Sequence, residues 1–112
     1  MNLDWCASYH RHILWILTEI QQALANSEFE KAAEIAEKRI GMSSLSTHGA
    51  AHLSRYLPKP MQEIGLDMHH VASQFALSAQ ESAIGNDVKP ALAALSKITQ
   101  QCVVCHTAYR VH

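Results

Sequence analysis

Three side chains near the carboxyl end of the chain could together hold an iron-containing cofactor. Cys102, Cys105 and His106 form the pattern Cys-x-x-Cys-His, in which two thiols add across the two vinyl groups of a haem and the adjacent imidazole binds the iron. On a helix these residues are related by steps of three and four, so they leave one face within about one turn. The pattern predicts one covalently bound haem c, with Cys102 and Cys105 as thioether anchors and His106 as the axial iron ligand.

Two other kinds of site use a Cys-x-x-Cys pair, namely thiol-disulfide redox motifs and zinc sites. Zinc is disfavoured because the sequence has no second Cys-x-x-Cys pair and only one further thiol, Cys6. A thioredoxin-like motif is disfavoured because no strand-helix-strand pattern surrounds the pair, which lies at the end of a predicted helix rather than at its start. The haem interpretation is therefore preferred.

The composition indicates one globular domain, residues 1–112. The chain is 48% hydrophobic, has a net charge of -1 with eight His residues, and contains no apolar run of membrane-spanning length. That charge favours neither nucleic acid nor an anionic membrane as a partner. The sequence also lacks a carboxylate pair, a nucleophile-base arrangement and a phosphate loop, so an enzyme is not predicted.

Thioether attachment of haem generally takes place outside the cytoplasm, which implies an export signal. The opening residues 1–5 lack the basic start and apolar stretch of such a signal. Either a signal has been removed from this sequence or the haem interpretation is wrong. We expect the former, and we expect the protein to be periplasmic.

Apolar residues recur at helical period along most of the chain. They predict a first helix from Leu3 to about Asn26, followed by a second helix that ends at Gly41, with residues 27–30 (Ser-Glu-Phe-Glu) as its capping box. Residues 47–56 could form a short helix, which would place His48 and His52 one turn apart, the spacing of a metal-binding pair.

Two longer helices are predicted in the second half of the chain. The third begins at Pro60 and is closed by Gly85 or Asn86, and the fourth is capped by Asp87 and runs through the Cys-x-x-Cys-His pattern. The apolar stripe of the fourth helix leads by helical steps into Cys102, so we expect the face that bears the haem to be the core-facing one. No strand pattern competes. The prediction is an all-α fold, an antiparallel four-helix bundle with the haem near the end of its fourth helix.

With Cys-x-x-Cys-His-x-x-Tyr-Arg at residues 102–110 of a small four-helix chain, the sequence resembles the cytochrome c′ family. The resemblance implies that Arg110 lies beside the proximal ligand His106. It also implies that the first helix covers the distal side of the iron. Matching the family's Tyr-Arg-x-x-x-Leu/Met pattern to residues 9–14 assigns Leu14 to the distal pocket, with His10 where the family has Arg. Homodimers are a further implication of the resemblance.

The distal residue decides what the site does. Leu14 cannot coordinate iron, so with Leu14 over the iron the protein would bind small diatomic gases such as NO or CO. His10, one turn away, could instead serve as a sixth ligand or lie in the distal pocket, and Met68 is another pocket residue and potential ligand. A sixth protein ligand would close the site and favour electron transfer.

Several other residues have alternative interpretations. His12, His69, His70 and His112 are predicted to be exposed or at the rim, and His48 with His52 on the surface. Cys6 is either a buried thiol or a link between subunits.

The predicted function is therefore that of a soluble periplasmic monohaem cytochrome, which transfers electrons with redox partner proteins, binds NO or CO, or does both. The alternative is a haem-free helical module that uses its Cys and His residues for metal binding or sensing.

Overall fold

The computed structural model describes residues 3–44 and 59–108, and it describes side chains for residues 11–44 and for 59–107 except Met61. The elements in chain order are α1 (Leu3–Ala25), α2 (Phe29–Arg39), the short 3-10 helix η1 (Met42–Ser44), α4 (Lys59–Gly85) and α5 (Lys89–Ala108). Within these ranges the secondary structure is entirely helical, which confirms the all-α prediction for the described part of the chain. The predicted helix over residues 47–56, with His48 and His52, lies outside it.

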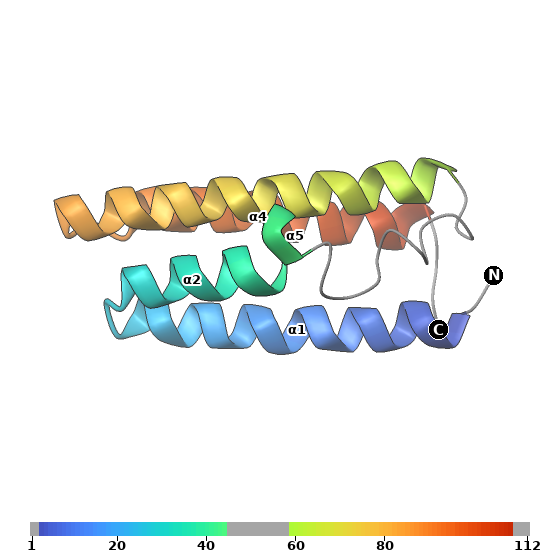
Figure 1. Ribbon diagram of the computed structural model, residues 1–112, viewed down its shortest axis with the longest axis horizontal. Coiled ribbons are helices and arrows are strands. Elements are labelled where there is room, and N and C mark those ends of the chain that lie inside the picture. Colours follow the sequence, from blue (N-terminus) through green and yellow to red (C-terminus); the bar gives the residue numbers. More distant parts are fainter. Residues whose placement is uncertain (1–2, 45–58, 109–112) are drawn as a thin grey trace.

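The helices form two hairpins that lie side by side (Figure 1). α2 packs against α1 and α4, and α5 packs against α4. The first turns of α1 and α4 and the last turns of α5 lie at the same end of the molecule (Figure 1). α2 has 11 residues against 20 or more in each of the other three helices, so it runs along only part of their length and does not reach that end.

One hydrophobic core joins all four helices. The stripes that face it have the helical period expected of helices that are apolar on one side. Because the four stripes meet, burial of these side chains is the main force that holds the hairpins together. The largest fully buried apolar side chains are Ile16, Ile20, Ile40, Phe75 and Ile98.

The turn between α1 and α2 differs from its prediction. Ser27 is not a capping-box residue: the N-cap is Glu28, without a side-chain cap bond, and Ser27 has a left-handed backbone with φ of 58°. Its N–H donates to the carbonyl of Leu24 (3.0 Å), and the N–H of Glu28 donates to that of Ala23 (2.8 Å). These two bonds satisfy carbonyls left over at the end of α1, so Ser27 ends the first helix instead of starting the second.

The turn between α4 and α5 agrees with its prediction. Asn86, with φ of 49°, ends α4, and the Asp87 carboxylate accepts a hydrogen bond of 3.1 Å from the N–H of Lys89 at the start of α5. The buried hydroxyl of Ser82 accepts another, of 3.0 Å, from the N–H of Ala91. Because the first N–H groups of a helix have no partner within it, the Asp87 bond caps α5, and the Ser82 bond fixes the start of α5 on α4.

A polar cluster of Glu37, Ser43 and Ser73 fixes the other end of α2. The Glu37 carboxylate accepts a hydrogen bond of 2.6 Å from the Ser43 hydroxyl, and the Ser73 hydroxyl on α4 accepts one of 2.9 Å from the backbone N–H of Met42. Hydrogen bonds, the stronger effect from Ser43 and a weaker one from Ser73, hold the pKa of Glu37 below its ordinary value because they stabilise the charged form.

The prediction that His69 is exposed or at the rim is wrong. The His69 side chain is 7% exposed and its Nδ1 donates a hydrogen bond to the backbone carbonyl of Ile40 at the end of α2. The last carbonyls of a helix need partners from elsewhere, and α4 supplies one here. His12 and His70 are exposed, as predicted.

None of the described helices combines the length and hydropathy needed to cross a membrane.

Candidate haem-attachment site

The last two turns of α5 carry the three residues of the predicted site. α5 is helical through Ala108, so Cys102, Cys105 and His106 have the one-face relation that the pattern requires. Cys102 follows Ile98 by four residues and packs against the hydrophobic core. Cys102 therefore continues the core-facing stripe of α5. Val103 and Val104, on the other sides of the helix, are exposed.

The two thiols have different surroundings. No disulfide involves Cys102 or Cys105, and both side chains are half-buried. Burial raises the pKa of the Cys102 thiol, and the neighbouring Cys105 adds to the increase. His106 is exposed at the last turn of the helix. Cys102 thus lies at the edge of the core. Cys105 and His106 lie further along α5, toward its end.

Met68 lies on α4 at the level of the motif. The contact between Ser82 and Ala91 sets the register of the α4–α5 hairpin. Met68 lies fourteen residues before Ser82 and Cys105 fourteen after Ala91, so equal helical rise puts these two positions opposite each other. Met68 is 7% exposed and belongs to the core. A buried thioether at this level is compatible with either packing or ligation.

The predicted distal residues lie on α1. Leu14 is 50% exposed, whereas Ile13 and Leu17 beside it are buried, so Leu14 occupies a flank of the helix rather than the centre of its core-facing stripe. His10 lies in α1 one turn earlier, and its side chain is outside the described part of the structure.

The level of His10 follows from two contacts between neighbouring elements. Glu19 of α1 forms an ion pair with Arg39 of α2, and Met42 of η1 is bonded to Ser73 of α4. We counted equal numbers of residues along neighbouring helices, starting from these two contacts and from the Ser82–Ala91 contact between α4 and α5. Because each helical residue rises by the same amount, this puts His10 at about the level of His106. The backbone position of His10 is therefore compatible with a distal role.

Several predicted site residues lie outside the described part of the structure. Arg110, His48 and His52 lie outside the described residues, and the side chain of Cys6 is also outside them. Across the described side chains, no group of three or more His, Cys, Asp or Glu residues could hold a metal ion.

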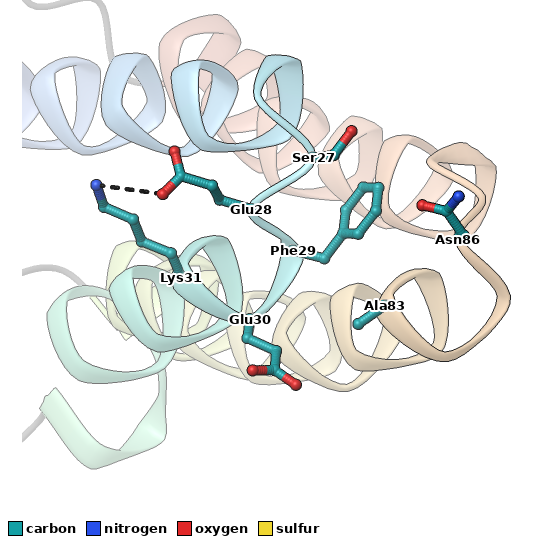
Figure 2. Close-up of a pocket in the computed structure, with 7 residues that line it drawn as sticks. All are labelled: Ser27, Glu28, Phe29, Glu30, Lys31, Ala83 and Asn86. Atoms are coloured by element: carbon teal, nitrogen blue, oxygen red, sulfur yellow. Dashed lines mark ion pairs between the residues drawn. The ribbon is translucent and has the colours of Figure 1, made fainter.

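A surface pocket lies at the end of the molecule far from the Cys-x-x-Cys-His motif (Figures 1 and 2). It is formed where the two interhelical turns meet, and an ion pair of 3.9 Å between Glu28 and Lys31 lies on its wall. It contains no predicted site residue. Its lining consists of Ser27, Glu28, Phe29, Glu30, Lys31, Ala83 and Asn86.

Comparison of the chain with protein-family models, with curated proteins and with solved structures gives no match. Support for a cofactor site therefore comes from the chain's own residues. Two thiols and an imidazole on one helical face, at the edge of an apolar core, have the chemistry that a covalently held haem needs.

Proposed function

We propose that the chain is an exported, periplasmic c-type cytochrome that carries one haem on α5. Cys102 and Cys105 form the two thioether bonds and His106 supplies the axial nitrogen. The observation that carries the proposal is the continuity of the motif with the buried stripe of α5, where Cys102 packs against the core one turn after Ile98. A flat apolar macrocycle fixed there would extend that core.

The helix arrangement supports the same proposal. The motif lies at the end of the molecule that α2 does not reach, the end that also holds the first turns of α1 and α4 (Figure 1). In an antiparallel four-helix bundle, a cofactor site is built from side chains of facing helices.

Electron transfer is the favoured activity, with His10 as the sixth ligand. A bound haem supplies one-electron chemistry at its iron, and its potential depends on the axial ligands. His10 is about level with His106 by counting from the contacts between helices, and its imidazole can ligate iron, whereas Leu14 cannot. An open distal side that takes NO or CO is the other form of the proposal, with Leu14 and Met68 as pocket residues and Arg110 beside His106.

The partners follow from the chemistry. An electron-transfer protein needs one partner protein that donates electrons and one that accepts them. A small cytochrome of this kind can also form a homodimer. Neither nucleic acid nor a membrane is included in the proposal, since the net charge of -1 favours neither.

The attachment chemistry is tested directly on protein made in an exporting host with haem-attachment machinery. We expect the haem to stay on the chain after denaturation, because thioether bonds survive unfolding. Cys102→Ala and Cys105→Ala should each retain at most one bond, which mass spectrometry of the haem-bearing peptide would show. The exposed neighbours provide matched controls: Val103→Ala and Val104→Ala should keep both bonds. Complete release of haem from the denatured wild-type chain would contradict the proposal.

A further inference from the structure

Gly65 is a helix-interior glycine without a packing reason within the described protein. It lies well inside α4, which spans Lys59–Gly85. A Cβ atom built on Gly65 would have no described atom within 4 Å, apart from its own helix backbone and chain neighbours. Gly41 shows the contrast, because a Cβ there would lie 2.8 Å from both the Glu37 carbonyl oxygen and the Ser73 hydroxyl. Glycine lowers helix stability relative to alanine, and at Gly65 no contact with the described residues offsets that cost.

The position of Gly65 connects it to the haem end. Met68, His69 and Ala72 follow it by three, four and seven residues, and all three are buried, so Gly65 shares the core-facing side of α4. Gly65 lies seventeen residues before Ser82, and Ala108 lies seventeen after Ala91. Equal rise along the hairpin therefore puts Gly65 opposite the helical turn that follows Cys105 and His106.

A core-facing position at this level would normally carry an apolar side chain, because unfilled space forfeits contacts. Glycine is instead the residue used where a ligand approaches the backbone closely. Resting on the proposed function, we propose that Gly65 is a haem-contact position, where the missing side chain lets the macrocycle lie against the backbone of α4. It is a positioning residue, because the size of the side chain at position 65 limits how closely the haem can approach α4.

The test is a size series at this position in protein with haem attached: Gly65→Ala, Gly65→Val and Gly65→Leu. The same three substitutions at Gly85 are the matched control, since Gly85 also has open space and lies at the far end of α4. The readouts are haem bound per chain, the position and width of the main visible absorption band, and the midpoint of thermal unfolding. None of them requires an activity assay.

We expect haem content to fall or the absorption band to shift progressively with side-chain size at position 65, and to stay unchanged at position 85. Gly65→Ala is the mildest variant, and the sign of its change in the unfolding midpoint distinguishes two explanations. Helix propensity alone predicts a higher unfolding midpoint, whereas crowding of a bound macrocycle predicts a lower one. A higher midpoint for Gly65→Ala, or an unchanged band in Gly65→Leu with full haem content, would overturn the inference. Failure of the wild-type chain to attach haem would instead overturn the proposed function.

Discussion

The imidazole of His69 on α4 donates a hydrogen bond through Nδ1 to the backbone carbonyl of Ile40, just past the end of α2. A carbonyl oxygen can only accept, so Nδ1 carries the proton. Both partners are buried, with Ile40 fully so and His69 at 7% exposure. The bond joins residues that are 29 positions apart in sequence and closes the end of α2, the shortest of the described α-helices.

His69→Ala should therefore lower the free energy of unfolding by about 1–3 kcal/mol, because it leaves a buried carbonyl without a partner. Denaturation in urea, followed by circular dichroism, measures the change. His70→Ala is the matched control: the adjacent residue is exposed, and its loss should change the free energy by less than about 0.5 kcal/mol. Equal effects of the two substitutions would show that the His69 bond does not stabilise the fold.

Gly41 should be intolerant of even one added methyl group. Its Cβ would lie 2.5 Å from Glu37 Oε2 and 2.8 Å from both the Glu37 carbonyl oxygen and Ser73 Oγ, and the carbonyl belongs to the backbone of α2. We expect Gly41→Ala to cost about 1–3 kcal/mol through overpacking. Gly85→Ala, where nothing lies within 4 Å, serves as the comparison in the same thermal unfolding assay. A Gly41 variant as stable as wild type would mean that α2 and η1 can move away from α4 at little cost.

Acid should weaken the junction of α2 with α4 through Glu37. Hydrogen bonds from Ser43 and Ser73 lower the pKa of Glu37 in the folded protein. The stability that this carboxylate adds is therefore present above the ordinary glutamate pKa of about 4.3 and is lost as the pH falls through the lower folded value. Urea midpoints measured from pH 7 down to about pH 3 should fall less in Glu37→Gln than in wild type.

Glu34 provides the control for that pH series. Its pKa is also lowered, by a hydrogen bond and ion pair with Lys38, but both side chains are exposed and salt screens such pairs. Glu34→Gln should change the pH dependence little at about 0.15 M salt. If Glu34→Gln flattens the profile as much as Glu37→Gln does, the Glu37 cluster has no special role in acid sensitivity.

The sequence predicted those features of the fold that are set by nearby residues. The period of apolar residues indicated α1 and α4 nearly to their observed ends, and Asp87 caps the start of α5 as predicted. Ser27 was misassigned because a serine suits both a helix N-cap and a left-handed turn, and the backbone bonds that decide between them were not visible in the sequence. Burial of His69 depends on a carbonyl far away in the chain, so no local pattern could indicate it.

The candidate site likewise has one part that is set by nearby residues and another that is set by contacts between helices. The spacing of Cys102, Cys105 and His106 is local, and Cys102 continues the buried stripe of α5, whereas His106 is exposed. The distal side depends on which residues of α1 and α4 come level with the motif, and that register is set by contacts between helices. Gly65 gives no sequence signal of its own, because an isolated helix glycine is explained only by what surrounds it.

The identity of the sixth ligand leads to the last prediction. In protein with haem attached, we expect His10→Ala to convert a low-spin spectrum that is indifferent to CO into a high-spin spectrum that shifts when CO is added. The reason is that the position of His10, about level with His106, suits a second axial imidazole, and its removal would open the iron to small ligands. Oxidised and reduced absorption spectra, with and without CO, measure the change.

Two variants separate His10 from the other distal residues. Met68→Leu keeps the volume and apolar character of a core side chain but removes the thioether, so it should leave the spectrum low-spin if His10 is the ligand. Leu14→Ala alters a half-exposed flank of α1 and should leave both spin state and CO response unchanged. A wild-type spectrum that is already high-spin and CO-sensitive, with Leu14→Ala changing the CO affinity, would instead establish Leu14 as the distal residue and gas binding as the activity.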